Sequence, residues 1–173
     1  LGKLLGLLIF NTKVLKVAKK KKIDLKWTPN RKEFFKTLKV KKKAGRAPWR
    51  IHEINEKLKK ITTKLKQKKL TKKKRQELQL QWLATAGTMG HYIADLAQPL
   101  HTSENYDGQL TKQKGLHVWF EKTALDELYP NLQKEIYKRA LNKWDKFTTD
   151  KASLSIFDLS IDLSKNSHAS LDR

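Results

Sequence analysis

The fold of this chain is decided by residues 90–121, which read GHYIADLAQPLHTSENYDGQLTKQKGLHVWFE. Three of the chain's five histidines lie there, each a short step along the chain from a carboxylate. His91 and Asp95 belong to an apolar run without proline, residues 82–97, which predicts a helix. Side chains four residues apart leave the same face of a helix one turn apart, so we expect these two side chains to lie together.

The same spacing recurs in His117 and Glu121, on a second predicted helix over residues 116–128. A Gln-Pro step at residues 98–99 lies between the two helices. Because proline pushes the residue before it out of the helical conformation, the first helix is predicted to end there, and His101 follows the break. The five side chains are therefore predicted to come from two helices and the corner that joins them.

Imidazole nitrogens and carboxylate oxygens form a donor set that suits zinc. With one i,i+4 pair on each helix, each helix would provide two ligands of a metal site. A lone His-x-x-x-Asp pair is a weak signal, common on protein surfaces. The joint pattern H-x-x-x-D-x-x-Q-P-x-H, a loop, and then G-x-H-x-x-x-E is much harder to obtain by chance. It predicts a metal site between the helices. The alternative is a helix pair that buries hydrogen-bonded polar residues.

At these residues the chain resembles the zinc-dependent phospholipase C family and the related single-strand-specific nucleases. Those proteins share one all-helical fold with a three-zinc site. The resemblance implies that His91 and Asp95 bind one zinc ion, with Asp95 bridging to a second. It also implies that His101, His117 and Glu121 bind the remaining ion.

The resemblance covers residues 47–130 and leaves part of the family's site without a counterpart. Family members also bind zinc through an N-terminal tryptophan and through two histidines and an aspartate upstream of the first ligand helix. Upstream here lie only His52, which we interpret as a structural histidine, and Asp24, both in other contexts. The catalytic base is likewise expected upstream, so we expect an incomplete bundle, the C-terminal part of a longer protein.

The length of 173 residues predicts a single domain over residues 1–173, with a core kept lean by 38% apolar and 32% charged residues. The chain has no cysteine. Disulfides and thiolate metal sites are therefore excluded, and histidine, aspartate and glutamate remain as metal ligands.

The net charge of +22 is concentrated at one end of the chain. Residues 1–80 hold 28 Lys and Arg against 5 Asp and Glu, a net of +23, whereas residues 81–173 hold 11 against 12, a net of −1. A region this basic attracts polyanions such as nucleic acid or acidic lipid headgroups. Only 6 of the 39 cations are arginine, the residue that bidentate phosphate recognition favours, so a coding bias toward lysine is an equal alternative.

The longest apolar run, Leu4–Phe10, is far shorter than the roughly 20 residues that a membrane-spanning helix needs. No small-residue cleavage site follows this run, so no signal peptide is predicted within the chain. The localisation is therefore undetermined, although the resemblance implies a secreted or periplasmic protein.

Apolar side chains at helical spacing, with capping residues and prolines at the boundaries, predict further helices along the whole chain. An amphipathic helix is predicted in residues 1–22, within a basic region, residues 1–46, whose docking is uncertain. The other predicted helices are Thr28–Lys43, opened by Thr28-Pro29; one opened by Ala47-Pro48; a long one capped by Thr71; Asn131–Phe147; and Ala152–Leu163, followed by a tail from Asn166.

Several apolar side chains are predicted to face inward on these helices. They are Phe34, Phe35, Ile51, Ile54, Leu58, Ile61, Leu78 and Trp82 before the metal-ligand stretch, and Trp119, Phe120, Leu125, Leu128, Leu132, Ile136, Tyr137, Leu141 and Trp144 within and after it. A turn is predicted at Asn105–Gly108. Because this turn follows His101, Asn105 is a candidate substrate-binding residue, with a plain turn as the alternative.

The sequence thus predicts an all-α bundle with two or three zinc ions between its central helices. The predicted reaction is hydrolysis of a phosphodiester bond, with a phospholipid or single-stranded nucleic acid as the substrate. The alternative is a non-catalytic basic helical module, or a decayed fragment, that binds polyanions through Lys57–Lys74.

Overall fold

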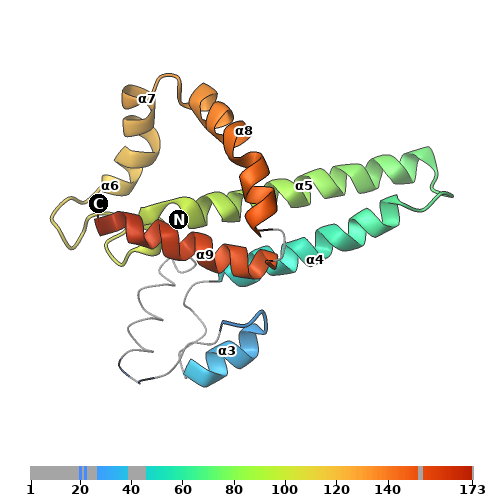
Figure 1. The fold of residues 1–173 in the computed structure, drawn as a ribbon, viewed down its shortest axis with the longest axis horizontal. Coiled ribbons are helices and arrows are strands. Elements are labelled where there is room, and N and C mark those ends of the chain that lie inside the picture. The colour runs from blue at the N-terminus through green and yellow to red at the C-terminus, as the bar shows by residue number, and fades with distance from the viewer. Residues whose placement is uncertain (1–19, 21, 23–26, 39–45, 152–153, 173) are drawn as a thin grey trace. The chain divides into compact units, whose positions relative to one another are not determined.

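A computed structural model describes residues 20, 22, 27–38, 46–151 and 154–172 (Figure 1). Every regular element in these ranges is helical and none is a strand, which confirms the predicted all-α class. The chain divides into two compact units, residues 1–103 with 156–173, and residues 104–155. The helix predicted in residues 1–22 lies outside the described residues, apart from Lys20 and Lys22.

The first unit is built on two long helices, α4 (Ala47–Leu65) and α5 (Lys72–Ala97), which pack against each other as a hairpin (Figure 1). Proline near the first position of α4 suits a helix start, because its missing N–H would have no partner there. The predicted apolar stripe of α4 is confirmed, and its buried members are Ile51, Ile54, Leu58 and Ile61.

The corner between α4 and α5 is fixed by polar contacts. The Thr71 hydroxyl accepts a hydrogen bond from the backbone N–H of Lys74 at 3.2 Å, which confirms threonine as the cap of α5. The guanidinium of Arg75 donates to the carbonyl oxygens of Leu65, at 3.0 Å, and Gln67, at 3.3 Å. Arg75 therefore satisfies carbonyls that the end of α4 leaves without helical partners.

A third helix, α9 (Ile156–Ala169), packs on both α4 and α5, and a 3-10 turn, η3 (Ser170–Asp172), follows it. The predicted tail from Asn166 is therefore wrong, because the helix continues for a further turn. The buried face of α9 carries Ser160, Ser164 and Ser167 beside Phe157 and Ile161. Such small side chains let helix backbones approach closely. A prediction that counts only apolar residues therefore underestimates the length of a helix whose buried face consists partly of serines.

The short helix α3 (Arg31–Leu38) contributes an aromatic cluster to the first unit. The rings of Phe34 and Phe35 lie 5.0 and 5.4 Å from that of Trp49, which in turn lies 5.4 Å from Phe157. The predicted burial of both phenylalanines is confirmed.

The predicted start of α3 is wrong by two residues. Thr28 accepts from the backbone N–H of Asn30, and the Asn30 side chain accepts from the N–H of Glu33. Asn30 therefore takes the capping role assigned to Thr28, since either side chain can cap and only the local geometry decides.

The second unit contains α6 (Leu116–Val118), a π-helical segment η2 (Trp119–Ala124), α7 (Leu125–Leu128) and α8 (Leu132–Lys151). Residues 116–128 were predicted as one regular helix, and the structure widens its middle into a π-helix. Several side chains predicted inward in this unit are exposed instead: Trp119, Phe120, Leu128, Ile136, Tyr137 and Leu141. The periodicity identifies the apolar face of a helix, but it does not say what covers that face. The side chain of Trp144 lies outside the described residues.

Among the described helices, none combines the length and the apolar character that a membrane crossing requires.

Candidate metal centre

The last two turns of α5 carry the first pair of candidate ligands. Nε2 of His91 lies 3.4 Å from Oδ2 of Asp95, as the i,i+4 spacing predicts. The two side chains differ in exposure, because the Asp95 side chain is 11% exposed and that of His91 is 59% exposed. A carboxylate this buried requires a cation or hydrogen-bond donors around it.

His101 is brought back toward the end of α5 by the predicted break. Gln98 is extended, the 3-10 turn η1 (Pro99–Thr102) begins at the proline, and the Gln98 side chain accepts from the backbone N–H of His101 at 3.2 Å. This reversal places Nδ1 of His101 3.1 Å from the backbone carbonyl oxygen of Asp95 and 3.5 Å from its Oδ1. The His101 side chain is 8% exposed.

The contact with the carbonyl indicates which tautomer a neutral His101 ring adopts. A carbonyl oxygen can only accept, so Nδ1 carries the hydrogen. In the neutral imidazole, the lone pair is then on Nε2, the arrangement that second-shell hydrogen bonds impose on metal-binding histidines. His91, Asp95 and His101, here called the α5 triad, therefore include an imidazole already in a metal-binding tautomer.

Asp95 lies between the two imidazoles of the α5 triad. Its Oδ2 faces His91 and its Oδ1 faces His101, at the 3.4 and 3.5 Å given by the two ion pairs. Oδ2 therefore faces a ring nitrogen of the exposed imidazole, whereas Oδ1 faces the Nδ1–H of the buried one. The bridging role that the family resemblance implies for Asp95 stays a prediction.

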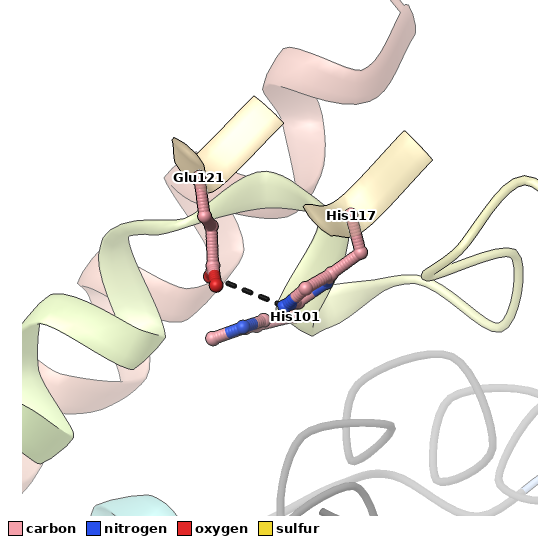
Figure 2. Close-up of side chains that lie close together, drawn as sticks. All are labelled: His101, His117 and Glu121. Carbon is pink, nitrogen blue, oxygen red and sulfur yellow. Dashed lines mark ion pairs between the residues drawn. The ribbon is translucent and has the colours of Figure 1, made fainter. Parts of the chain in front are cut away.

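The second unit supplies His117 and Glu121, here called the η2 pair. Nε2 of His117 lies 3.1 Å from Oε1 of Glu121, and Figure 2 shows this contact as a dashed line. Glu121 lies within the π-helical segment, and π-helical turns are frequent at functional sites. A π-helical turn contains more residues than an α-helical turn, so side chains four apart come closer to alignment along the axis.

The loop before α6 orients the start of the η2 pair. Oδ1 of Asp107 accepts from the backbone N–H of His117 at 3.2 Å, and the carbonyl oxygen of Asp107 accepts from the N–H of Gly115 at 3.1 Å. Gly115 has a φ of 98°, which glycine adopts without strain. Asp107 was read from the sequence as a turn residue, and only its place ten residues before His117 could have suggested this second role.

Asn105 is engaged within the same loop. Its Oδ1 accepts from the N–H of Leu110 at 2.7 Å, and its Nδ2 donates to the Thr111 hydroxyl at 3.0 Å. The predicted turn is confirmed by the hydrogen bond from the N–H of Gly108 to the carbonyl of Asn105 at 3.2 Å. These bonds give the Asn105 amide a structural role, and its binding of substrate stays a prediction.

Three of the five predicted ligands, His101, His117 and Glu121, each offer one ligand atom, and together they are a group that could hold a metal ion (Figure 2). The two remaining histidines have other surroundings. The His52 ring lies edge-on to Phe157 with centroids 6.2 Å apart, and Nδ1 of His168 lies 3.5 Å from the Thr102 hydroxyl.

Comparison with protein families, with curated proteins and with solved structures gives no match. The resemblance to the phospholipase C and nuclease proteins therefore rests on the ligand pattern of this chain.

Proposed function

We propose that this chain is a zinc-dependent hydrolase of phosphodiester bonds, in which the α5 triad and the η2 pair hold the metal ions. His91 and Asp95 would hold one ion, and the resemblance implies that Asp95 would also reach a second. His101, His117 and Glu121 bind another. The complete site of this kind takes two or three zinc ions.

The observation that carries the proposal is the set of nitrogen and oxygen donors: Nε2 of His91 lies 3.4 Å from Oδ2 of Asp95, and His101, His117 and Glu121 are a group that could hold a metal ion. The contact of His101 supports it, because an Nδ1–H that donates to the Asp95 carbonyl is the hydrogen bond that metal-binding histidines commonly make through their other ring nitrogen. The all-nitrogen-and-oxygen donor set fits zinc, and the chain has no cysteine to offer a softer site.

Zinc in such a site supplies Lewis-acid polarisation of the phosphoryl group and lowers the pKa of water. The residues of the chain would hold the zinc ions and orient the side chains that bind them. The Asp95 carboxylate would supply negative charge to a bound cation, and the buried contact between Nδ1 of His101 and the Asp95 carbonyl orients the His101 ring. Asp107 holds the backbone of His117 in place.

The direct test measures zinc per chain after metal loading, together with hydrolysis of bis(p-nitrophenyl) phosphate. We expect at least one tightly held zinc ion per chain, and a chelator should abolish whatever turnover the chain shows without the expected upstream base. Glu121→Gln should lower both readouts, whereas the matched control Glu127→Gln, an exposed glutamate in the same part of the chain, should leave both unchanged. A chain that retains no zinc after loading would reject the proposal.

Two substrate classes fit a phosphodiester hydrolase of this kind. Parallel assays on phosphatidylcholine vesicles and on single-stranded nucleic acid separate them. Binding of polyanions that persists unchanged with a chelator, without turnover of either substrate, would favour the non-catalytic alternative.

A further inference from the structure

The α4–α5 hairpin carries an apolar groove that has no part in the metal centre. The groove has a volume of about 750 Å³, lies between the end of α4 and the first half of α5, and its lining includes Leu65, Leu80, Trp82 and Leu83. Leu80 is 67% exposed and Leu83 is 62% exposed. Three large apolar side chains thus lie within four residues of a helix surface that is otherwise polar. Such an exposed apolar patch is typical of a surface that binds a partner.

Trp82 is held at the edge of this groove. Its Nε1 donates to the Thr62 hydroxyl at 3.0 Å, and the side chain is 37% exposed. With its only polar atom satisfied, the part of the ring that remains exposed is apolar. A tryptophan with a satisfied N–H and an exposed ring edge is typical of side chains at a membrane–water interface.

The stretch of chain that forms the corner next to the groove is densely positive. Residues 57–75 contain 11 Lys and Arg and no Asp or Glu, a net of +11. The one arginine, Arg75, is bound to carbonyl oxygens of the corner, so the exposed cations here are lysines. Lysine is a compact point charge that suits a diffuse anionic surface, whereas specific phosphate recognition favours the arginine fork.

Figure 1 shows that the corner between α4 and α5 extends beyond α9. The core beneath α9 is formed instead by Ala47, Ile51 and Leu96, at the other end of the hairpin. We call the lysine-rich corner with its groove, residues 57–83, the hairpin tip.

We propose that the hairpin tip docks on the surface of an anionic lipid bilayer. The lysines attract the acidic headgroups, and Leu80, Trp82 and Leu83 enter the interface beneath them. Each lysine near an anionic membrane adds electrostatic attraction, and the apolar side chains add affinity in proportion to their buried area. Two exposed leucines beside the tryptophan favour acyl chains over nucleic acid, because single-stranded nucleic acid uses aromatic rings for stacking and has little use for aliphatic ones. This proposal is independent of the metal centre, since none of its residues is a candidate ligand.

The first experiment measures co-sedimentation of the full chain with large unilamellar vesicles, in buffer containing a chelator. One set of vesicles is pure phosphatidylcholine, and the other contains about one third phosphatidylglycerol. We expect binding to the anionic vesicles that weakens at high salt and little binding to the neutral ones. Equal binding to both kinds of vesicle, or to neither, would overturn the proposal.

Two pairs of variants separate the hairpin tip from general charge attraction. Leu80→Gln/Leu83→Gln should weaken vesicle binding about tenfold, whereas Leu110→Gln, a leucine that is also strongly exposed, should not. Lys68→Gln/Lys69→Gln/Lys72→Gln should weaken binding at least tenfold more than Lys114→Gln/Lys134→Gln/Lys138→Gln, which removes the same charge from exposed positions elsewhere. All these positions are exposed, so circular dichroism should show the same helix content throughout. Equal losses in the two lysine triples, or no loss with the leucine pair, would mean that this surface does not dock on lipid.

Direct insertion is tested by tryptophan fluorescence with brominated lipids. The anionic vesicles should quench part of the emission of the native chain, and Trp82→Phe should remove that quenched part. Competition between the vesicles and a single-stranded oligonucleotide tests the alternative that the surface binds nucleic acid. If the oligonucleotide binds more tightly than the vesicles and the leucine pair leaves its binding unchanged, the surface recognises nucleic acid and the lipid proposal is wrong.

Discussion

Nδ1 of His101 lies 3.1 Å from the backbone carbonyl oxygen of Asp95, so this nitrogen serves the fold, and Nε2 is the ring nitrogen that we assign to the proposed metal. His101→Asn should separate these two roles. The asparagine amide can still donate to the Asp95 carbonyl, but asparagine has no atom in the position of Nε2. We therefore expect this variant to lose zinc while keeping nearly the native free energy of unfolding without metal.

The companion variant His101→Ala should lose both roles. The buried carbonyl of Asp95 would then lack this donor, which costs about 1–3 kcal/mol of stability. Urea unfolding of the metal-free proteins and zinc analysis of the loaded ones provide the measurements. If His101→Asn is as unstable as His101→Ala, or if it retains zinc, the assignment of the two nitrogens is wrong.

The charge of Asp95 should matter more to metal binding than to the fold. Asp95→Asn keeps the shape of the side chain and removes a carboxylate that faces two imidazoles. We expect the variant to fold and to bind at least one zinc ion fewer than the native chain under saturating conditions. Asp126→Asn, at an exposed position, is the matched control and should bind the native amount. Unchanged stoichiometry in Asp95→Asn would exclude Asp95 as a ligand.

Asp107 should act on zinc affinity through His117. Asp107→Ala removes the acceptor for the backbone N–H of His117, and loss of such a cap costs about 1 kcal/mol. Because supports of this kind orient metal ligands, zinc affinity should fall at least about tenfold in a competition titration. Asp126→Ala should change neither quantity. A variant with native zinc affinity and lowered stability would show that the hydrogen bond serves the loop alone.

Replacing Gly108 by a residue with a side chain should destabilise the loop. It has a φ of 72°, and a Cβ there would overlap the backbone carbonyl of Gln113. Gly108→Ala should therefore cost at least about 1–2 kcal/mol. Gly87 lies within α5 with open space around it, so Gly87→Ala should stabilise the chain by about 0.5–1 kcal/mol. Thermal unfolding by circular dichroism compares the two, and a stabilising Gly108→Ala would contradict the loop geometry.

The sequence was sufficient for features that depend on local chemistry. Threonine at position 71 caps α5, the Gln-Pro step ends it, and Ala47-Pro48 opens α4. The i,i+4 pairs His91–Asp95 and His117–Glu121 form as their spacing requires. Each of these depends on residues within about one helical turn, where few conformations compete.

Features that depend on distant partners could not be predicted in the same way. α9 continues beyond Leu163 because serines pack as well as apolar residues where helices come close, and periodicity does not register them. Tyr137 and Leu141 lie four residues apart on one face of α8, as an apolar stripe requires, yet both are exposed. Asp107 reaches His117 through the path of a loop that turn propensities do not specify.

The π-helical segment also limits how the chain can change in length. Backbone N–H groups in η2 bond to carbonyls five residues back, so this stretch holds surplus chain compared with an ordinary helix. Deleting one residue after Glu121 would remove that surplus, so the segment could tighten into a regular helix while Leu125–Leu128 keep nearly the same orientation about the axis. Deleting Phe120 would also shorten the His117–Glu121 spacing from four residues to three, so the π-helical segment tolerates a shorter chain only on the far side of the carboxylate.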